Sequence, residues 1–136
     1  MTREKYVSQD IYLLMKKKGF DGWKRAILYG DGDMRNWGYT EAQIFPSLAV
    51  AMEWLREVHH IHVCPEYKTF FQERPKKIYH HWCNKIIGIG RCFQQGIQDL
   101  NELDSDYFYH HGCKTYHDTF EEACEECVDF VLKNLI

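Results

Sequence analysis

Residues 120–135, the last segment of the chain, limit the fold most strongly, because they carry an apolar stripe with the period of an α-helix. The stripe recurs at spacings of three and four residues, through Phe120, Ala123, Cys124, Cys127, Val128, Val131 and Leu135. Such a stripe places one side of a helix against a core. Thr119 precedes the stripe and Glu122 follows three positions later, as in a capping box. We therefore predict a closing helix with one apolar and one acidic face.

Two further helices are predicted from capping residues and periodicity. The first spans residues 8–18, with Ser8 as its N-cap and Gly19 as its C-terminal stop. The second begins after Pro46, a residue suited to a helix start, and its apolar stripe extends to Val58.

The segments between the helices have strand-like patterns. We predict separate strands over residues 23–29, 34–39, 61–64 and 107–113. Residues 77–83 and 86–93 are predicted to form a hairpin, with Asn84 and Lys85 as its two-residue turn. Residues 94–106 are polar and weakly patterned, which is typical of either a poor helix or a loop.

These elements predict an α+β fold with an antiparallel sheet packed by about three helices. A chain of 136 residues is expected to form a single domain. Residues 1–45 have the order α-β-β, and residues 46–136 the order α-β-β-β-α of a double-stranded-RNA-binding domain. No apolar run approaches the roughly 20 residues that span a bilayer, and residues 1–10 lack a signal-peptide core. We therefore expect a cytoplasmic protein without a membrane partner.

The distribution of charge bears on the kind of partner. The formal net charge is −3, whereas a nucleic-acid-binding domain is usually basic. Double-stranded-RNA-binding domains usually carry lysines at the start of the last helix, where this chain has Glu121 and Glu122. We expect a basic protein partner to bind the acidic face of the closing helix, formed by Glu121, Glu122, Glu125, Glu126 and Asp129. A solvated face without a partner is the alternative interpretation.

Histidine and cysteine are frequent, and both are zinc ligands. Two candidate ligand groups are apparent, one formed by His60, His62 and Cys64, the other by His110, Cys113 and His117. In an extended segment His60, His62 and Cys64 share one face of the strand. If that strand pairs with residues 77–83, then His80, His81 and Cys83 can meet them across the ladder. No other cofactor is predicted.

Cys124 and Cys127 have the C-x-x-C spacing of many zinc and redox sites. They nevertheless lie on the apolar face of the closing helix, in mid-helix and among glutamates, which raise a thiol pKa. We interpret both as core residues, since a reduced cysteine packs as a small hydrophobe.

No catalytic motif is recognisable in the chain. Gly88 and Gly90 begin like a dinucleotide-binding fingerprint, but Phe93 stands where the third glycine belongs. Neither a P-loop nor a G-x-S-x-G elbow occurs. We therefore favour a non-enzymatic role.

Three segments resemble a group of small bacterial proteins: Ala49–Val63, Asp118–Cys124 and Lys133–Ile136. The group consists of small uncharacterised proteins of gut anaerobic bacteria, their phages and their mobile elements. Lys16–Asp21 is similar to the end of their opening helix. The resemblance covers most of the chain, except about residues 65–113, so a specific function is expected in that middle part. It implies a cytoplasmic accessory protein, and it brings no activity, cofactor or site residue.

The favoured hypothesis is therefore a non-enzymatic protein-interaction module. The first alternative is a zinc-binding protein that uses the histidine and cysteine groups. The second is nucleic-acid binding through three basic segments, Lys16–Lys18, Lys24 and Arg74–Lys77. A nucleic-acid partner predicts a steep loss of affinity with salt.

Overall fold

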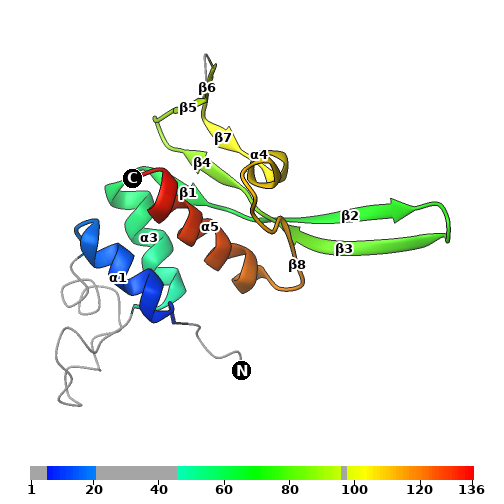
Figure 1. Cartoon of the computed structure of the whole chain (residues 1–136), viewed down its shortest axis with the longest axis horizontal. Helices are drawn as coiled ribbons and strands as arrows, with labels where there is room; N and C mark the ends of the chain where they lie inside the picture. Colours follow the sequence, from blue (N-terminus) through cyan, green and yellow to red (C-terminus); the bar gives the residue numbers. More distant parts are fainter. Residues whose placement is uncertain (1–5, 21–45, 96–97) are drawn as a thin grey trace.

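The computed structural model describes residues 6–20, 46–95 and 98–136, and its α+β fold confirms the predicted class (Figure 1). Its helices are α1 (Gln9–Lys17), α3 (Leu48–Val58), α4 (Ser105–His110) and α5 (Phe120–Asn134). Its strands are β1 (Ile61–Val63), β2 (Glu66–Gln72), β3 (Lys77–Cys83), β4 (Ile86–Gly88), β5 (Phe93–Gln95), β6 (Gln98–Leu100), β7 (Glu102–Leu103) and β8 (Tyr116–His117). The strands predicted over residues 23–29 and 34–39 lie outside the described residues.

The three helices predicted from the sequence are confirmed, and each begins at a polar capping residue. Ser8, Ser47 and Thr119 precede α1, α3 and α5, and each side-chain hydroxyl accepts a hydrogen bond from the backbone N–H three residues later, at 3.1 to 3.2 Å. These bonds satisfy N–H groups that have no partner within the helix. Gly19 follows α1 with φ of +96°, a backbone conformation that favours glycine.

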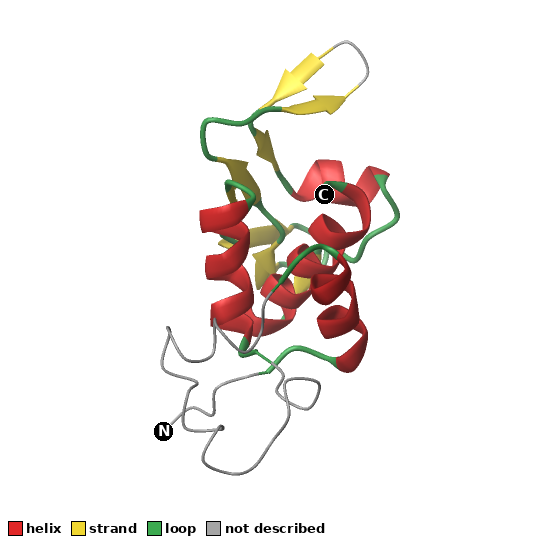
Figure 2. Ribbon diagram, turned by 90° about the vertical axis from the view of Figure 1, so that its left-hand side faces the viewer, coloured by secondary structure: helices red, strands yellow, loops and turns green. Residues whose placement is uncertain are grey.

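The core forms where α1 and α3 pack against α5, and where α3 and α5 contact β1. In Figure 2 the helices gather in one body, and the β5–β6 pair extends away from it. Cys124 and Cys127 are fully buried in this core. Burial is the main cause that raises the pKa of Cys124 to about 12 and the pKa of Cys127 well above its usual value. The interpretation of both cysteines as core residues is confirmed.

The strands form separate small antiparallel sheets. One has the order β1-β4-β7, the second the order β2-β3-β8, and β5 pairs with β6. In the first sheet Ile61, Val63 and Ile86 are buried beneath the helices. Among the described residues, no helix is long and apolar enough to cross a membrane.

The hairpin predicted over residues 77–93 is wrong, because β3 pairs with β2 while β4 pairs with β1 and β7. Asn84 and Lys85 do not turn the chain back but carry it from one sheet to the other. The buried Asn84 donates its side-chain N–H to the carbonyl oxygen of Lys114 at 2.9 Å. The Lys85 carbonyl oxygen accepts from the backbone N–H of Cys64 at 3.0 Å. These contacts hold the two residues in place as a crossover.

The strand predicted over residues 107–113 is also wrong, because α4 occupies most of this segment. The Asp104 carboxylate caps α4 by accepting hydrogen bonds from the backbone N–H groups of Asp106 and Tyr107, at 3.1 and 3.3 Å. Phe108 is then fully buried in the core. From α3 to α5 the order is still helix, strands, helix, as predicted, with α4 and additional short strands between them.

Candidate interaction surface

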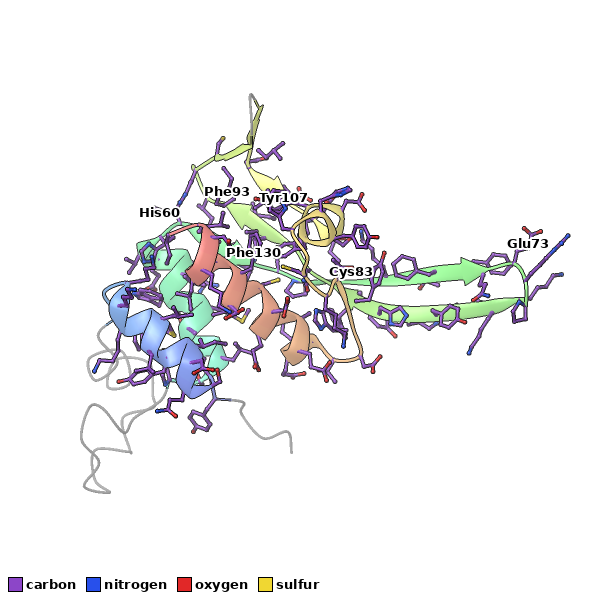
Figure 3. The ribbon with its side chains drawn as sticks, viewed as in Figure 1. His60, Glu73, Cys83, Phe93, Tyr107 and Phe130 are labelled. Carbon is purple, nitrogen blue, oxygen red and sulfur yellow. The ribbon has the colours of Figure 1, made fainter. Side chains whose placement is uncertain are left out.

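A long β-hairpin, here called the arm, projects from the body of the protein (Figure 1). It consists of β2, the turn of residues 73–76, and β3, and the two strands pair along all seven residues of each. At about 3.3 Å per residue the seven-residue strands of the arm are about 23 Å long. Within the described part of the chain, a third strand joins the arm at its base alone, where Trp82 and Cys83 pair with β8. Figure 3 places Glu73 at the far end of the arm and Cys83 at its base.

One side of the arm, here called the Tyr67 face, carries exposed apolar and aromatic side chains. Successive side chains of a strand alternate between faces, and directly paired residues share a face. The face therefore comprises Tyr67, Thr69, Phe71, Ile78, His80 and Trp82. The exposed fractions are 57% for Tyr67, 67% for Phe71 and 59% for Ile78. The rest of the described chain thus leaves this face largely uncovered.

The other side of the arm is also aromatic, but β8 covers part of it. Phe70 lies 5.1 Å from Tyr116 of β8, measured between ring centroids. Further out, Tyr79 donates its hydroxyl hydrogen to Gln72 at 2.8 Å. Lys77 places its ammonium group 4.9 Å from the centre of the Tyr79 ring. Local contacts of this kind hold the outer arm together.

The far end of the arm is basic. Arg74, Lys76 and Lys77 lie there against one acid, Glu73. All four residues are exposed, and the described part of the chain provides no ion pair to these three cations. The end of the arm, here called the tip, therefore presents positive charge to an approaching partner.

The base of the arm is fixed to the body by charge and by ring packing. Lys85 forms ion pairs with Glu66 of β2 and with Glu102 of β7, the latter at 3.0 Å. The pKa of Lys85 is raised, because its hydrogen bonds to Glu66 and Glu102 favour the charged ammonium group. The Trp82 ring lies 5.0 Å from that of Phe120, at the start of α5. These contacts orient the arm at its base relative to the body.

An acidic hollow of about 360 Å³ opens between α1 and α5. Its lining includes Asp10, Glu122, Glu125, Glu126, Asp129 and His117. Lys133 also lines it and pairs with Asp129 at 3.0 Å, which leaves the carboxylates in excess. The structure therefore brings together four of the five acids predicted for partner binding, whereas Glu121 is not part of the lining. Asp10 and His117 join them only through the tertiary fold.

His117 connects the hollow to the arm. It belongs to β8, pairs with Trp82, and therefore lies on the same side of the sheet as the Tyr67 face. Its Nε2–H donates to the Lys114 carbonyl oxygen at 3.1 Å. Burial lowers the pKa of His117, against the opposing influence of Glu126 and Glu122.

The first group of predicted zinc ligands does not share one strand face. His60 has φ of +57° and lies before β1, so it is not part of an extended strand with His62 and Cys64. Because β1 pairs with β4, the strand that carries His80, His81 and Cys83 does not lie beside it. Figure 3 shows His60 and Cys83 well apart.

The second group of predicted ligands consists of His110 at the end of α4, half-buried Cys113 and His117. Among the residues described, no group of three or more histidine, cysteine or acidic side chains has an arrangement that can hold a metal ion. Zinc binding stays a prediction, which metal analysis of protein purified without a chelator tests directly.

The basic segments proposed for nucleic acid do not form one surface. Lys16–Lys18 end α1, whereas Arg74–Lys77 form the tip at the opposite end of the molecule (Figure 1). Lys24 lies outside the described residues. A single nucleic-acid strand or duplex therefore has no continuous basic track between the two described segments.

The six thiols are expected to react in three classes, since they differ in burial. Cys92 is exposed and should react at once with Ellman's reagent. Half-buried Cys64 and Cys113, whose thiol pKa values burial raises, should react slowly. The remaining three, buried Cys83, Cys124 and Cys127, should react only after unfolding in guanidinium. Stopped-flow absorbance with mass spectrometry of the labelled peptides measures the classes.

The control for this thiol experiment is Cys92→Ser, which should remove the fast phase and leave the others unchanged. Labelling of Cys124 or Cys127 in the folded protein at the rate of Cys92 would contradict the packing described above.

Comparison of the chain with protein-family models, with curated proteins and with solved structures gives no match. The resemblance of its helical segments to small proteins of gut anaerobes stays a prediction. The function is therefore inferred from the arm and the acidic hollow.

Proposed function

We propose that this protein is a non-enzymatic protein-interaction module and that the arm is its main binding element. The observation that supports this proposal is the exposure of Tyr67, Phe71 and Ile78 on a hairpin that projects from the body. A two-stranded hairpin is marginally stable in water by itself. A partner that covers the Tyr67 face buries the side chains that the described part of the chain leaves exposed there.

The composition of the arm suits protein recognition. Aromatic side chains are enriched at protein interfaces, and a few of them supply most of the binding energy. Tyr67 and Trp82 pack against each other at 5.1 Å and are therefore held in place before binding. Because the tip is basic, the preferred partner has carboxylates beside an apolar surface. The acidic hollow is a second contact surface, suited to a basic segment.

Nucleic-acid binding is the second candidate, and the tip is the observation that favours it. The major groove of DNA admits a two-stranded β-ribbon, and Arg74, Lys76 and Lys77 lie at the end of such a ribbon. The net charge of −3 and the separation of the tip from Lys16–Lys18 favour a protein partner instead. Mobility-shift assays at low and high salt distinguish the two classes.

The test of the protein-interaction proposal is site-specific photo-crosslinking in the cells that produce the protein. A benzophenone amino acid replaces Phe71 on the arm. In the control it replaces Leu13, which is similarly exposed on α1. We expect a nuclease-resistant crosslink to one protein at position 71 and none at position 13.

The crosslinked protein is then purified, and its binding is measured directly by calorimetry. Phe71→Ser should weaken binding at least about tenfold, and Leu13→Ser should leave it unchanged. The absence of a crosslink above the control, or a crosslink that nuclease destroys, would overturn the proposal.

A further inference from the structure

We propose that the partner of the arm is a second copy of this chain, and that each tip binds the acidic hollow of the other copy. This inference rests on the proposed function and names the partner. It follows from three features of the described residues: the charges of the tip and the hollow, their positions on one face, and the length of the arm.

The charges of the two regions are complementary. The tip presents Arg74, Lys76 and Lys77 without ion pairs in the described part of the chain. The lining of the hollow includes five carboxylates and Lys133, which pairs with Asp129 at 3.0 Å. Such an arrangement of opposite charges steers association and fixes the register of an interface. Figure 3 places Glu73 of the tip at the end of the arm far from α1 and α5, the helices that line the hollow, so within one copy the two regions do not meet.

The hollow and the exposed side of the arm lie on one face of the molecule. Tyr67 contacts Trp82, which contacts Phe120 at the start of α5, with ring-centroid distances of 5.1 and 5.0 Å. Phe120 is 38% exposed and begins α5, the helix that carries Glu122 and Glu126 of the hollow. His117, which pairs with Trp82, lines the hollow itself. An apolar strip therefore leads from the arm to the rim of the hollow.

The length of the arm matches a symmetric arrangement. Two arms that lie antiparallel, with their Tyr67 faces together, overlap along about 23 Å. Each tip then lies beside the base of the other arm, where His117 and Phe120 border the hollow. The interface is isologous, since the same residues of both copies take part, and it closes after two copies. Thr69 and His80, the middle pair of the arm, lie at the centre, and Phe71 and Ile78 near the tip are covered by the Tyr67 and Trp82 rings of the second copy.

The experiment is sedimentation velocity of the full chain over a range of concentrations, at about 50 mM and about 500 mM salt. We expect a dimer whose dissociation constant rises at least about tenfold at the higher salt, because exposed ion pairs are screened. Two charge reversals test the contact from each side. Arg74→Glu with Lys76→Glu changes the tip, and Glu122→Lys with Glu126→Lys changes the hollow.

Each reversal alone should weaken the dimer at least about tenfold, and the chain with all four changes should regain most of the affinity. Lys16→Glu with Lys17→Glu, at the opposite end of the molecule, is the matched control and should leave the dimer unchanged. Circular dichroism and thermal unfolding confirm that every variant is folded. For a reversal that does not fold, Phe71→Ser with Ile78→Ser replaces it and should also weaken the dimer at least about tenfold.

A monomer at every concentration, or a dimer that neither reversal affects, would overturn the inference. Failure of the four-fold variant to recover affinity would also overturn it. A crosslink from position 71 to a different protein, in a chain that stays monomeric, would preserve the proposed function while removing self-association. The experiments can therefore contradict self-association while the proposed protein-interaction function stands.

Discussion

Replacement of Phe108 by alanine is expected to lower the free energy of unfolding by about 3–5 kcal/mol. Phe108 is fully buried, and its ring lies 4.8 Å from that of Phe130 on α5. The substitution leaves a cavity between α4 and α5 in addition to the lost apolar burial. The free energy of unfolding of a small domain is about 5–15 kcal/mol, so this single substitution removes a large part of it.

Chemical denaturation followed by circular dichroism measures this effect. Tyr109→Ala is the matched control, since Tyr109 is the next residue of α4 and is 70% exposed, and it should change stability by less than about 0.5 kcal/mol. Phe108→Leu, which keeps most of the volume, should cost about 1 kcal/mol and remains measurable even where the alanine variant does not fold. Equal effects at positions 108 and 109 would show that α4 does not dock on α5.

Gly88→Ala is expected to cost about 3 kcal/mol or more, because a side chain at this position meets backbone atoms. A Cβ atom on Gly88 would lie 2.0 Å from the carbonyl oxygen of Arg91 and 2.9 Å from its carbonyl carbon. The backbone N–H of Gly88 also donates to Asn101 at 2.7 Å, so the strand is not free to withdraw. Relief of the clash therefore requires displacement of β4 or of the turn that follows it.

Displacement of the turn that follows β4 would also disturb the contacts of the Arg91 side chain. Its guanidinium group donates to the carbonyl oxygens of His59 and Leu135, both at 2.9 Å. It thus joins the C-terminal ends of α3 and α5, where a cation is favoured by the helix dipoles. Movement of this turn weakens both contacts, which adds to the expected loss of stability.

Gly90→Ala is the matched control for Gly88→Ala. Gly90 has φ of +63° but open space around the position of a Cβ atom. Its replacement should cost only about 1–2 kcal/mol, from the strain of a left-handed residue. Thermal unfolding of both variants separates the effect of a steric clash, expected at Gly88, from that of backbone strain, expected at Gly90. A larger loss at Gly90 than at Gly88 would contradict the close approach of Arg91.

The helices could be predicted from the sequence because their signals are local. Ser8 and Thr119 cap helices whose apolar stripes are continuous, and both features act within a few residues along the chain. The sequence does not predict the helix α4, because Tyr107, Phe108 and Tyr109 favour a strand by propensity. The capping carboxylate of Asp104 and the burial of Phe108 outweigh that preference.

The strand pairing could not be predicted for a different reason. Lys77–Cys83 and Ile86–Gly88 are both strands, and two residues separate them, as in a hairpin. The choice of partner depends on β2, which was not recognised in the sequence because its polar and aromatic residues follow Pro65 without regular alternation. The pairing of the strands is determined by contacts between segments that are distant in sequence, such as the hydrogen bond from the Asn84 side chain to the Lys114 carbonyl oxygen.

Part of the candidate surface also follows from local sequence patterns, and the rest depends on tertiary packing. By itself, the sequence determined that α5 has an acidic face opposite a buried one, since helical spacing alone places Glu122, Glu126 and Asp129 together. The tertiary structure decided that Asp10 and His117 join these acids in a hollow, and that the middle of the chain forms a projecting arm. Periodicity acts over a few residues, whereas a hollow and an uncovered sheet face exist only once separate elements have packed.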